Sequence, residues 1–370
     1  MRVLHLTSGN MYGGVETFLT TLAREATLVP DMRSEFALCW EGRLSNELAQ
    51  LGTRPHVLGH VRISRPHTVV RARQALRALL AGERFDIVVC HQPWSAVVFG
   101  SVVRHSRLPL VLWVHMAGEG KHWLEKLARR TRPDLAICNS RFSVECTGKW
   151  LSRVQIEHVY YPVSRPDVDG GVTRAAVRRR LQTDEREAVI VQVSRLEAWK
   201  GQLVLLEALS RVNHVDGWTC WIVGGAQCAS ERRYLHDLRE FAQRAGIEHR
   251  LRFAGERSDI PAVLAAADIF CQPNTTPEPF GLAMVEALRA GLPVVTSAIG
   301  GACEIVDSSC GVLTPPGDAA AVAGALQRLI ADDQLRSRLS ARARLRPHEI
   351  CDPVNQMHRI RDVLSSVQAA

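Results

Sequence analysis

The 370-residue chain lacks the features that mark several large classes of protein. No uninterrupted apolar stretch approaches the ~20 residues of a membrane-spanning helix, and the longest candidates, such as Leu108–Val114, have the length of a strand. The first residues form too short an apolar run for a secretory signal and lack a small-residue cleavage site. No low-complexity segment is present. These absences predict a globular, cytoplasmic protein.

Closely spaced cysteine pairs are also missing, although the chain has ten cysteines. The closest pair, Cys303 and Cys310, is seven residues apart, so the C-x2-C spacing of many metal and redox sites does not occur. Most cysteines lie in apolar runs, where a free thiol behaves as a small hydrophobic group. We therefore predict reduced core cysteines at positions such as Cys39, Cys90, Cys138, Cys220 and Cys271.

Lysine is scarce, because only four of the 46 basic residues are lysines: Lys121, Lys126, Lys149 and Lys200. The arginines are spread along the whole chain, and no zinc-finger, basic-zipper or RNP signature accompanies the net charge of +8. We expect no nucleic-acid partner. Such a basic surface fits anionic small molecules or an anionic membrane surface.

Strand-length apolar runs alternate with helix-length amphipathic segments from end to end. Ile87–His91, Leu110–His115 and Leu135–Asn139 are examples from the first half, and Ala188–Val193 and Trp218–Val223 from the second. Strands that are apolar on both faces and separated by helices predict parallel sheets covered by helices on both sides. The fold class is therefore α/β.

The alternation breaks within 160–187, where Pro162, Pro166, Gly170 and Gly171 form a turn-rich stretch. We expect an N-terminal domain over 1–160, a linker over 161–187, a C-terminal domain over 188–345, and a final helix over 346–370. Two domains also suit the length. Doubly wound, Rossmann-like domains bind ligands in the crevice beyond the carboxyl ends of their strands.

The densest chemical signal begins at Glu278 and ends at Glu286. Gly281 allows a tight turn, so that the amides of Phe280, Gly281 and Leu282 can point at one anion with a helix start behind them. Glu286 would lie ~7 Å along that helix, at the depth of a ribose attached to a diphosphate. Glu278 would lie on the other side of the phosphates. A capped surface helix is the alternative interpretation.

This stretch is similar to the E-x7-E motif of retaining glycosyltransferases of the GT-B fold, in glycosyltransferase family 4. Gly13–Glu16, Asn139–Arg141 and Gly300–Glu304 agree with that family in the expected order. Val193–Gly201 resembles its G-R-L-x3-K-G segment, with Ser194 in place of the usual glycine. The resemblance covers essentially the whole chain. It implies two doubly wound parallel-sheet domains facing a central cleft, with the final helix crossing back to the first domain.

The same resemblance agrees with a physical interpretation of three basic side chains. Arg195 and Lys200 flank a turn after the first strand of the second domain, where both could hold a diphosphate and stabilise its growing charge. Two solvated surface cations are the alternative. His115 follows a strand at the edge where ligands bind, and the resemblance implies that it contacts the donor sugar. A structural histidine is the alternative there.

Other positions leave more alternatives open. Gly13 and Gly14 would let backbone amides approach the phosphates from the first domain, or they form an ordinary turn. Asn139 and Ser140 line the ligand edge or cap the following helix. The basic segment 121–130 either lies on an anionic membrane or a lipid-linked acceptor, or packs an apolar face on the sheet.

The implied reaction moves a sugar from a nucleotide-diphosphate sugar to an acceptor hydroxyl with retention at the anomeric carbon. The acceptor is a carbohydrate, a lipid-linked sugar or a small molecule, and the enzyme works in the cytoplasm or at the inner face of the cytoplasmic membrane. We expect no cofactor and no metal, because the D-x-D sequence at Asp167 and Asp169 lies in the turn-rich linker. An epimerase or hydrolase of the same fold, or an inactive nucleotide-sugar-binding protein, are the alternatives.

Overall fold

In the computed structural model, which describes residues 1–164 and 173–368, the chain forms two α/β units. The first consists of Met1–Ser164 together with Cys351–Ala370, and the second of Arg165–Ile350. Asp167 and Asp169 lie outside the described residues. No helix in the described part of the chain combines the length and the apolar character that crossing a membrane requires.

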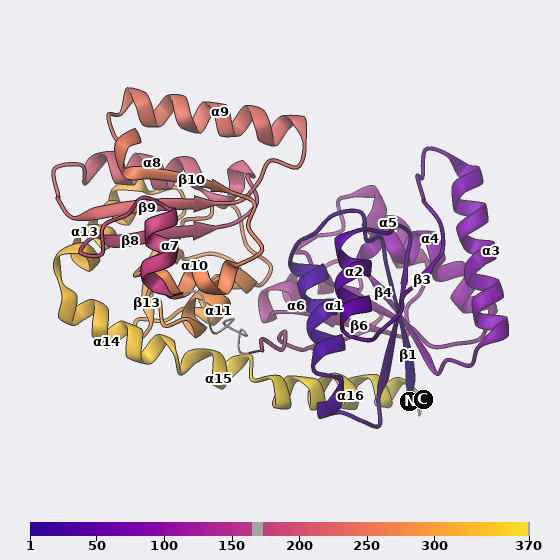
Figure 1. Ribbon diagram of the computed structural model, residues 1–370. Coiled ribbons are helices and arrows are strands. Elements are labelled where there is room, and N and C mark those ends of the chain that lie inside the picture. Colours follow the sequence, from indigo (N-terminus) through magenta and orange to yellow (C-terminus); the bar gives the residue numbers. More distant parts are fainter. Residues whose placement is uncertain (165–172, 369–370) are drawn as a thin grey trace. The chain divides into compact units, whose positions relative to one another are not determined.

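The first unit contains a seven-stranded parallel sheet in the order β3-β2-β1-β4-β5-β6-β7 (Figure 1). Its strands are β1 (Arg2–Thr7), β2 (Arg33–Leu38), β3 (His56–Val57), β4 (Ile87–His91), β5 (Leu110–Val114), β6 (Leu135–Cys138) and β7 (Gln155–His158). Its helices are α1 (Gly14–Arg24), η1 (Ala26–Leu28), α2 (Arg43–Gln50), α3 (Pro66–Gly82), α4 (Gln92–His105), α5 (Trp123–Arg130), α6 (Arg141–Gly148) and α16 (Pro353–Gln368).

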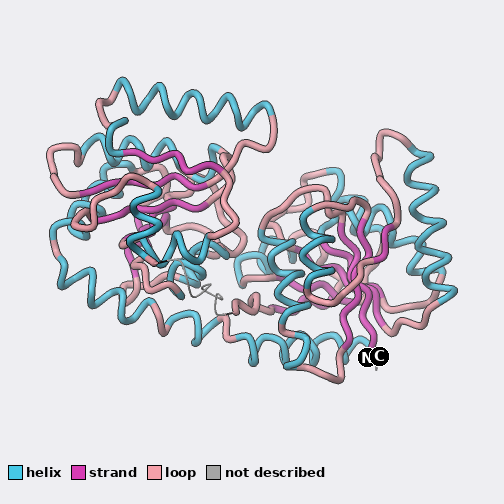
Figure 2. Tube along the Cα trace, viewed as in Figure 1, coloured by secondary structure: helices cyan, strands magenta, loops and turns pink. Residues whose placement is uncertain are grey.

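The second unit contains a six-stranded parallel sheet in the order β10-β9-β8-β11-β12-β13 (Figure 2). Its strands are β8 (Ala188–Val193), β9 (Trp218–Val223), β10 (Leu251–Gly255), β11 (Ile269–Gln272), β12 (Val294–Ser297) and β13 (Gly311–Thr314). Its helices are α7 (Arg174–Arg180), η2 (Ala198–Lys200), α8 (Gln202–Arg211), α9 (Ala229–Arg244), η3 (Glu248–Arg250), α10 (Ile260–Ala266), α11 (Leu282–Arg289), α12 (Ala302–Ile305), α13 (Ala319–Ala331), α14 (Asp333–Ala343) and α15 (Arg346–Ile350).

The predicted fold class, two doubly wound parallel-sheet domains, is confirmed. The first six strands of the first unit and the six strands of the second have the same order when each unit is numbered from its own first strand. In each, the order reverses between the first strand and the fourth, which is β1 and β4 in one unit and β8 and β11 in the other. Ligands of such sheets bind beyond the carboxyl ends of the strands at this point. Ligand-binding residues are therefore expected in the loops that follow β1, β4, β8 and β11.

The central strands form because their residues are apolar on both faces. Every residue of β4 and β5 is buried, and the helix α4 that follows β4 is buried along one face. Each fully buried Val, Leu or Ile stabilises the fold by ~1.5–3 kcal/mol relative to an exposed side chain. The five strand cysteines predicted to be core residues are buried and free.

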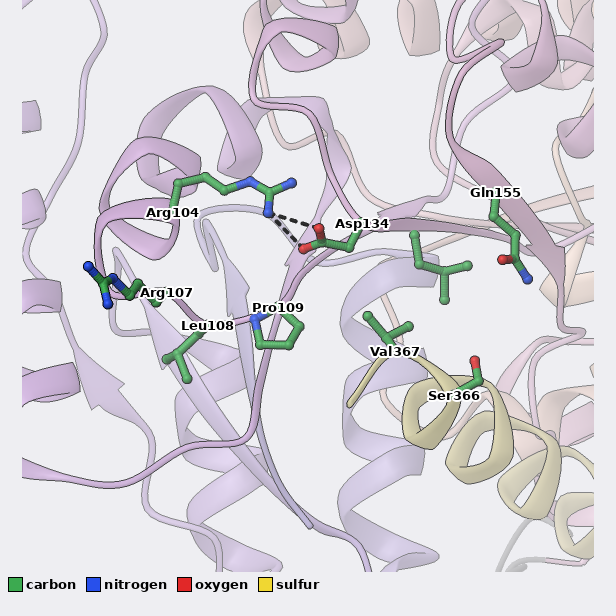
Figure 3. Close-up of a pocket in the computed structure, with 9 residues that line it drawn as sticks. Arg104, Arg107, Leu108, Pro109, Asp134, Gln155, Ser366 and Val367 are labelled. Atoms are coloured by element: carbon green, nitrogen blue, oxygen red, sulfur yellow. Dashed lines mark hydrogen bonds and ion pairs between the residues drawn. The ribbon is translucent and has the colours of Figure 1, made fainter. Parts of the chain in front are cut away.

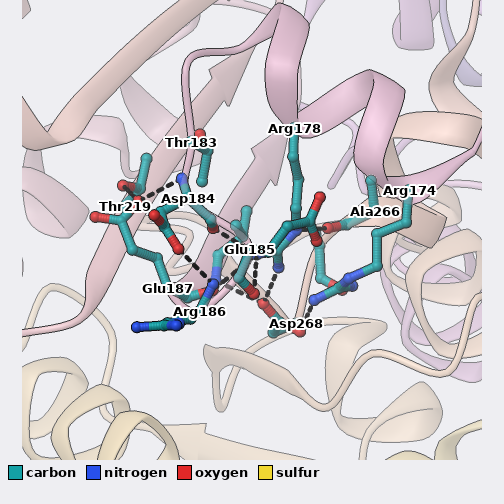
Figure 4. Close-up of polar contacts among 12 residues, drawn as sticks. Arg174, Arg178, Thr183, Asp184, Glu185, Arg186, Glu187, Thr219, Ala266 and Asp268 are labelled. Atoms are coloured by element: carbon teal, nitrogen blue, oxygen red, sulfur yellow. Dashed lines mark hydrogen bonds and ion pairs between the residues drawn. The ribbon is translucent and has the colours of Figure 1, made fainter.

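A fully buried arginine links the first helix of the second unit to the sheet of that unit (Figure 4). The Arg178 guanidinium on α7 donates to four backbone carbonyls, those of Asp184, Glu185, Glu187 and Ala266, and to the Asp268 carboxylate at 2.5 Å. Asp268 also accepts from the backbone N–H of Val189 in β8. Arg178 thus joins α7 to the first and fourth strands of this sheet.

The helix α5 packs differently from the apolar-face alternative considered from its sequence. Its buried residues are Glu125 and Ala128, it packs against α4, and Trp123 is 49% exposed. The Glu125 carboxylate accepts from the backbone N–H of His122 and so caps the helix start. The exposed face therefore carries Trp123 together with cations such as Lys126.

The final segment is divided between the two units. The helix α15 belongs to the second unit, and α16, which begins at Pro353, belongs to the first. Arg361 of α16 contacts the Asp31 carboxylate at 3.3 Å, and the end of α16 lies beside the N-terminus in Figure 1. A helix break at Pro353 follows from the missing N–H of proline.

Candidate functional site

The loops after β8 and β11 meet through a glycine contact. Gly201 has φ +76°, and a Cβ at this position would lie 1.9 Å from the carbonyl oxygen of Pro273. Only glycine fits there, because any side chain would collide with this backbone. The turn that carries Lys200 therefore rests directly on the loop that follows β11.

This contact brings the Lys200 ammonium to the Glu278 carboxylate. Lys200 Nζ donates to Glu278 Oε2 at 2.6 Å, and the two side chains are only 15% and 12% exposed. Gln272 Nε2 and Asn274 Nδ2 donate to the same oxygen at 3.2 and 3.1 Å. Lys200 Nζ also lies 4.0 Å from the centre of the Trp199 ring. Glu278 is thus fixed by three donors, two of them from the end of β11.

Three buried polar atoms around this cluster have no hydrogen-bond partner among the described residues: Gln192 Oε1, Gln272 Oε1 and Arg195 Nε. Their residues lie at or just beyond the carboxyl ends of β8 and β11. Buried polar groups in folded proteins are nearly always paired, so a group of unpaired ones needs an explanation. Unfilled hydrogen-bonding capacity at the switch point of the sheet is typical of a ligand site.

The Arg195 side chain pairs with two carboxylates that are not part of the Lys200–Glu278 cluster. Its Nη2 donates to Glu231 Oε1 at 2.8 Å, and its Nη1 lies 3.3 Å from Glu197 Oε1. Glu231, at the start of α9, is buried, which raises its pKa, but the N–H of Gln227 and the Arg195 guanidinium outweigh this and lower the pKa overall. Arg195 and Lys200 therefore pair with different carboxylates at the same edge of the sheet.

The helix α11 begins without a side-chain cap. Its N-cap is Gly281, with φ +106°, a left-handed conformation that side chains rarely adopt. The first N–H groups of a helix have no acceptor within the helix, and glycine supplies none. Phe280 is buried, whereas Leu282 in the first turn is partly exposed. That the N–H groups of Phe280, Gly281 and Leu282 bind an anion at this helix start stays a prediction.

Glu286 lies on α11, with no hydrogen bond or ion pair to its carboxylate among the described residues. Burial raises the pKa of this carboxyl to about 7. A half-buried carboxylate without a partner is unusual, because burial of an unpaired charge is unfavourable. The side chain is therefore ready to accept hydrogen bonds that the protein itself does not provide.

In the first unit, Gly13 is the N-cap of α1 and Gly14 its first residue. The Gly13 N–H already donates to Glu16 Oε2 at 3.0 Å. No atom outside the neighbouring residues lies within 4 Å of a Cβ built on Gly14. Of the two predicted glycine amides, the one left for a ligand is therefore that of Gly14.

His115 follows β5 at the carboxyl edge of its sheet, but its ring is already engaged. Its Nε2 lies 2.7 Å from His91 Nδ1, and its Nδ1 is hydrogen-bonded to the Tyr161 hydroxyl. The residue is 6% exposed, and burial lowers the pKa of its imidazole to about 3. A sugar hydroxyl that bonds to this ring must displace one of these two partners.

The capping alternative holds for Ser140. Its hydroxyl accepts from the backbone N–H of Ser143, which makes Ser140 the N-cap of α6. Asn139 Nδ2 donates to the Tyr161 hydroxyl at 3.0 Å, and its Oδ1 accepts from the Ser143 hydroxyl at 3.0 Å. Both side chains therefore serve the interior of the first unit.

One group of metal-capable side chains gathers within residues 1–164 and 173–368, namely Glu35, His56 and Glu83. The Arg2 guanidinium lies 2.7 Å from both carboxylates of this group. A cation already pairs with the cluster, which includes none of the residues predicted to bind a ligand. It offers no metal centre to the site.

A cavity of about 430 Å³ lies at the opposite edge of the first sheet (Figure 3). It is bounded by the amino ends of β5, β6 and β7 and by the end of α16, and Arg104 forms an ion pair with Asp134 on its wall. None of the residues predicted to bind a ligand lines it. The candidate site in the second unit is instead a set of loops and a helix start.

Gln272, Asn274 and Glu231 are site residues that the sequence analysis missed. Gln272 and Asn274 follow an apolar strand, and this polar ending was the available signal. Glu231 lies 36 residues beyond Arg195, and no spacing rule connects the two. Only the sheet order, which places β9 beside β8, brings the start of α9 to Arg195.

Comparisons with known proteins match both units to one group of enzymes. The family model "Glycosyltransferase Family 4" matches residues 12–164, and the model "Glycosyl transferases group 1" matches residues 173–346. The chain is 30% identical over 297 residues to the D-inositol 3-phosphate glycosyltransferase of Salinispora tropica, covering 71% of this chain. It is 34% identical over 169 residues to the lipopolysaccharide core biosynthesis glycosyltransferase LpsE of Rhizobium meliloti, covering 45% of this chain.

These two alignments span 60% and 47% of the relatives' own lengths. A structural match extends further. The crystal structure of Anabaena HepE in complex with UDP-glucose superimposes with a TM-score of 0.86 at 26% identity, covering 99% of this chain and 100% of HepE. The two-unit architecture is therefore that of the GT-B fold.

Proposed function

The chain belongs to glycosyltransferase family 4, the glycosyl transferases group 1, and we propose that it transfers a sugar from a nucleotide-diphosphate sugar to an acceptor hydroxyl with retention of configuration. The observation that carries this proposal is the Lys200–Glu278 pair beside an uncapped helix start in the second unit. Cations, free amides and a fixed carboxylate at one switch point suit a diphosphate joined to a sugar.

In this proposal the diphosphate lies at the start of α11. The amides of Gly281 and Leu282 bind its oxygens, and Arg195 and Lys200 neutralise the charge that grows as the sugar leaves. Glu286, whose carboxylate has no partner among the described residues, accepts the two ribose hydroxyls. Glu278 lies beside the departing sugar. In the first unit, we assign the Gly14 amide to phosphate binding and the unit as a whole to the acceptor.

The chemistry requires a base for the acceptor hydroxyl. The described carboxylates of the site are already assigned, since Glu278 is bound by three donors and Glu231 by Arg195. The family resemblance implies that an oxygen of the leaving diphosphate takes the proton, on the same face of the sugar, and we include this step in the proposal. Catalysis then depends on positioning and on stabilising the leaving group, with no metal ion.

The donor is tested first by calorimetric titration with a panel of UDP- and GDP-sugars, beginning with UDP-glucose because HepE is solved with it. Retention is tested by NMR on the first anomer released when the bound donor reacts slowly with water. We expect the anomer that matches the donor, and the opposite anomer refutes retention. Rapid formation of an epimer or of free sugar supports an epimerase or hydrolase instead.

The leaving-group role is tested with Lys200→Ala. Because the diphosphate gains charge mainly in the transition state, kcat should fall much more than KM rises. Lys149→Ala is the matched control, since this lysine is exposed in the other unit and lies outside the basic segment 121–130. Unchanged kcat with weaker substrate binding would show that Lys200 only binds the ground state.

The acceptor and the location of the enzyme are proposed more broadly. The acceptor is a carbohydrate, a lipid-linked sugar or a small molecule, and the enzyme works in the cytoplasm or at the inner face of the cytoplasmic membrane. The exposed Trp123 and the surrounding cations of α5 support contact with an anionic surface. Co-sedimentation with vesicles of anionic phospholipid, compared between the wild type and Trp123→Ala, tests this contact.

A further inference from the structure

Polar side chains in or just after five adjacent strands of the first sheet form one continuous row. His5 lies in β1, His91 ends β4, and His115, Asn139 and Tyr161 come after β5, β6 and β7. The sheet order β1-β4-β5-β6-β7 places these strands side by side. Residues that are scattered over 156 positions of sequence thus meet at one edge.

The row is joined by direct hydrogen bonds. His5 Nδ1 lies 2.9 Å from His91 Nε2, and His91 Nδ1 lies 2.7 Å from His115 Nε2. The His115 Nδ1 bonds to the Tyr161 hydroxyl, which also accepts from Asn139 Nδ2. Each of the two inner histidines therefore uses both of its ring nitrogens within the row.

All three imidazoles are neutral near pH 7. They are buried, and burial lowers the pKa of His5 and His115 to about 3 and that of His91 well below its usual value. A neutral imidazole has one N–H donor and one acceptor nitrogen. Each ring must therefore donate to one neighbour and accept from the other, so the direction of one bond fixes the direction of the next.

Only two arrangements of protons satisfy this condition. In one, Tyr161 donates toward His115 and every ring donates onward to His5. In the other, every bond runs the opposite way. The buried Nε2 of His5 has no partner among the described residues, and an unpaired acceptor nitrogen is tolerated there better than an unpaired N–H, so His5 selects the second arrangement, with its proton on Nδ1.

An aromatic layer holds the row in place. Phe18 of α1 packs on the rings of Trp113, His115 and Tyr161, with centroid distances of 4.7, 5.7 and 4.6 Å. Trp113 lies parallel to His115, with 3° between their planes. The helix that begins at Gly14 is therefore packed directly onto the ring of His115.

We propose that this row is a positioning device, in which His5 and His91 set the tautomer and orientation of the His115 ring at the carboxyl edge of the first sheet. The inference deepens the proposed function, because it concerns what this edge presents to the reacting sugar. A sugar hydroxyl that displaces Tyr161 from His115 meets a neutral ring whose protonated nitrogen is already chosen. His5, which does not touch His115, acts on it only through His91.

The tautomers are tested by NMR of ¹⁵N-histidine-labelled protein. In the wild type we expect each of the three rings to show one tautomer, with one protonated and one unprotonated nitrogen. A mixture of tautomers, or a charged imidazolium near pH 7, overturns the proposal even before any variant is made. This measurement needs neither a donor nor an acceptor.

The coupling is tested with a pair of variants at His5. His5→Phe keeps a ring but removes the hydrogen bond to His91, whereas His5→Gln keeps an amide that can replace it. We expect His5→Phe to change the ring nitrogen signals of His115 and His5→Gln to restore them. Trp113→Phe is the control, because it disturbs the same aromatic layer but removes no bond of the row. Unchanged His115 signals in His5→Phe overturn the proposal.

The functional consequence is measured as turnover of UDP-glucose, or of whichever sugar nucleotide of the panel is turned over. We expect His5→Phe to lower kcat by ~10- to 100-fold, as small misplacements far from the chemistry do, with UDP affinity unchanged because the cation cluster lies in the second unit. Wild-type kcat in His5→Phe overturns the positioning role. Failure of the wild type to bind UDP would instead defeat the proposed function and leave the NMR result standing.

Discussion

The buried position of Glu286 leads to a quantitative prediction about how nucleotide affinity depends on pH. Burial raises the pKa of this carboxyl to about 7, and no described residue compensates its charge. Near pH 7 about half of the molecules therefore carry a carboxylate there and about half a neutral acid. Two ribose hydroxyls donate best to the carboxylate, because charge-assisted hydrogen bonds are the stronger ones. Nucleotide binding should consequently favour the ionised form.

The magnitude can be worked out from this pKa. The ionised fraction falls from ~90% at pH 8 to ~10% at pH 6, so the Kd should rise about tenfold over this range, which is ~1.4 kcal/mol. Binding at pH 7 should release about half a proton, since the carboxyl becomes ionised in the complex. Affinity therefore weakens as the pH falls, and the change is concentrated around pH 7.

Isothermal titration calorimetry with UDP-glucose at pH 6, 7 and 8 tests this, in two buffers that differ in ionisation heat. UDP-glucose is suitable because its diphosphate is esterified at both ends and has no proton to lose near neutral pH. Glu286→Gln is the control, since an amide accepts hydrogen bonds but does not titrate. The same pH slope in this variant, or proton uptake on binding, would refute the assignment of Glu286 to the ribose.

Three further predictions concern stability and metal. Because the buried histidines stay neutral when folded but protonate below pH 6.5 when unfolded, the free energy of unfolding should fall as the pH drops from 6.5 toward 3. His91→Phe should reduce that slope in urea melts by ~1.4 kcal/mol per pH unit, and an unchanged slope contradicts the lowered pKa. Arg178→Met should destabilise the protein by ~3–5 kcal/mol, because it leaves buried carbonyls and Asp268 unpaired, and a loss below ~1 kcal/mol in the same melts contradicts this role. Activity should survive EDTA treatment and the Asp167→Ala/Asp169→Ala double substitution, whereas a loss that manganese or magnesium restores would show that a metal neutralises the leaving group.

The sequence predicted the central strands of both sheets closely, but missed most of the edge strands. Ile87–His91 and Ala188–Val193 were identified with their observed bounds, because each is a continuous apolar run. Three edge strands, β3, β7 and β13, were not predicted. β7 (Gln155–His158) has polar residues at three of its four positions and is only partly buried, so its apolar signal is weak. Such strands form because a neighbour offers hydrogen bonds, and that information is not local.

In the second unit, the sequence predicted individual residues of the candidate site but not how they pair. Glu278, Arg195 and Lys200 lie in short motifs with turn residues between them, and the family resemblance rests on those motifs. That Lys200 pairs with Glu278 while Arg195 pairs with Glu231 was not predictable, because 78 and 36 residues separate the members of these pairs. Loop packing at Gly201 decides the first pair, and sheet order decides the second.

The two units share the order of six strands, yet they place opposite chemistry at the same topological position. Beyond β8 and β11 stand permanent charges, Arg195, Lys200 and Glu278, each held by specific partners. Across β1, β4 and β5 stand three imidazoles that burial keeps neutral. A diphosphate needs fixed positive charge, whereas an uncharged sugar can be bound by neutral groups whose hydrogen bonds have a defined direction. The contrast supports the proposal that the diphosphate binds to the second unit.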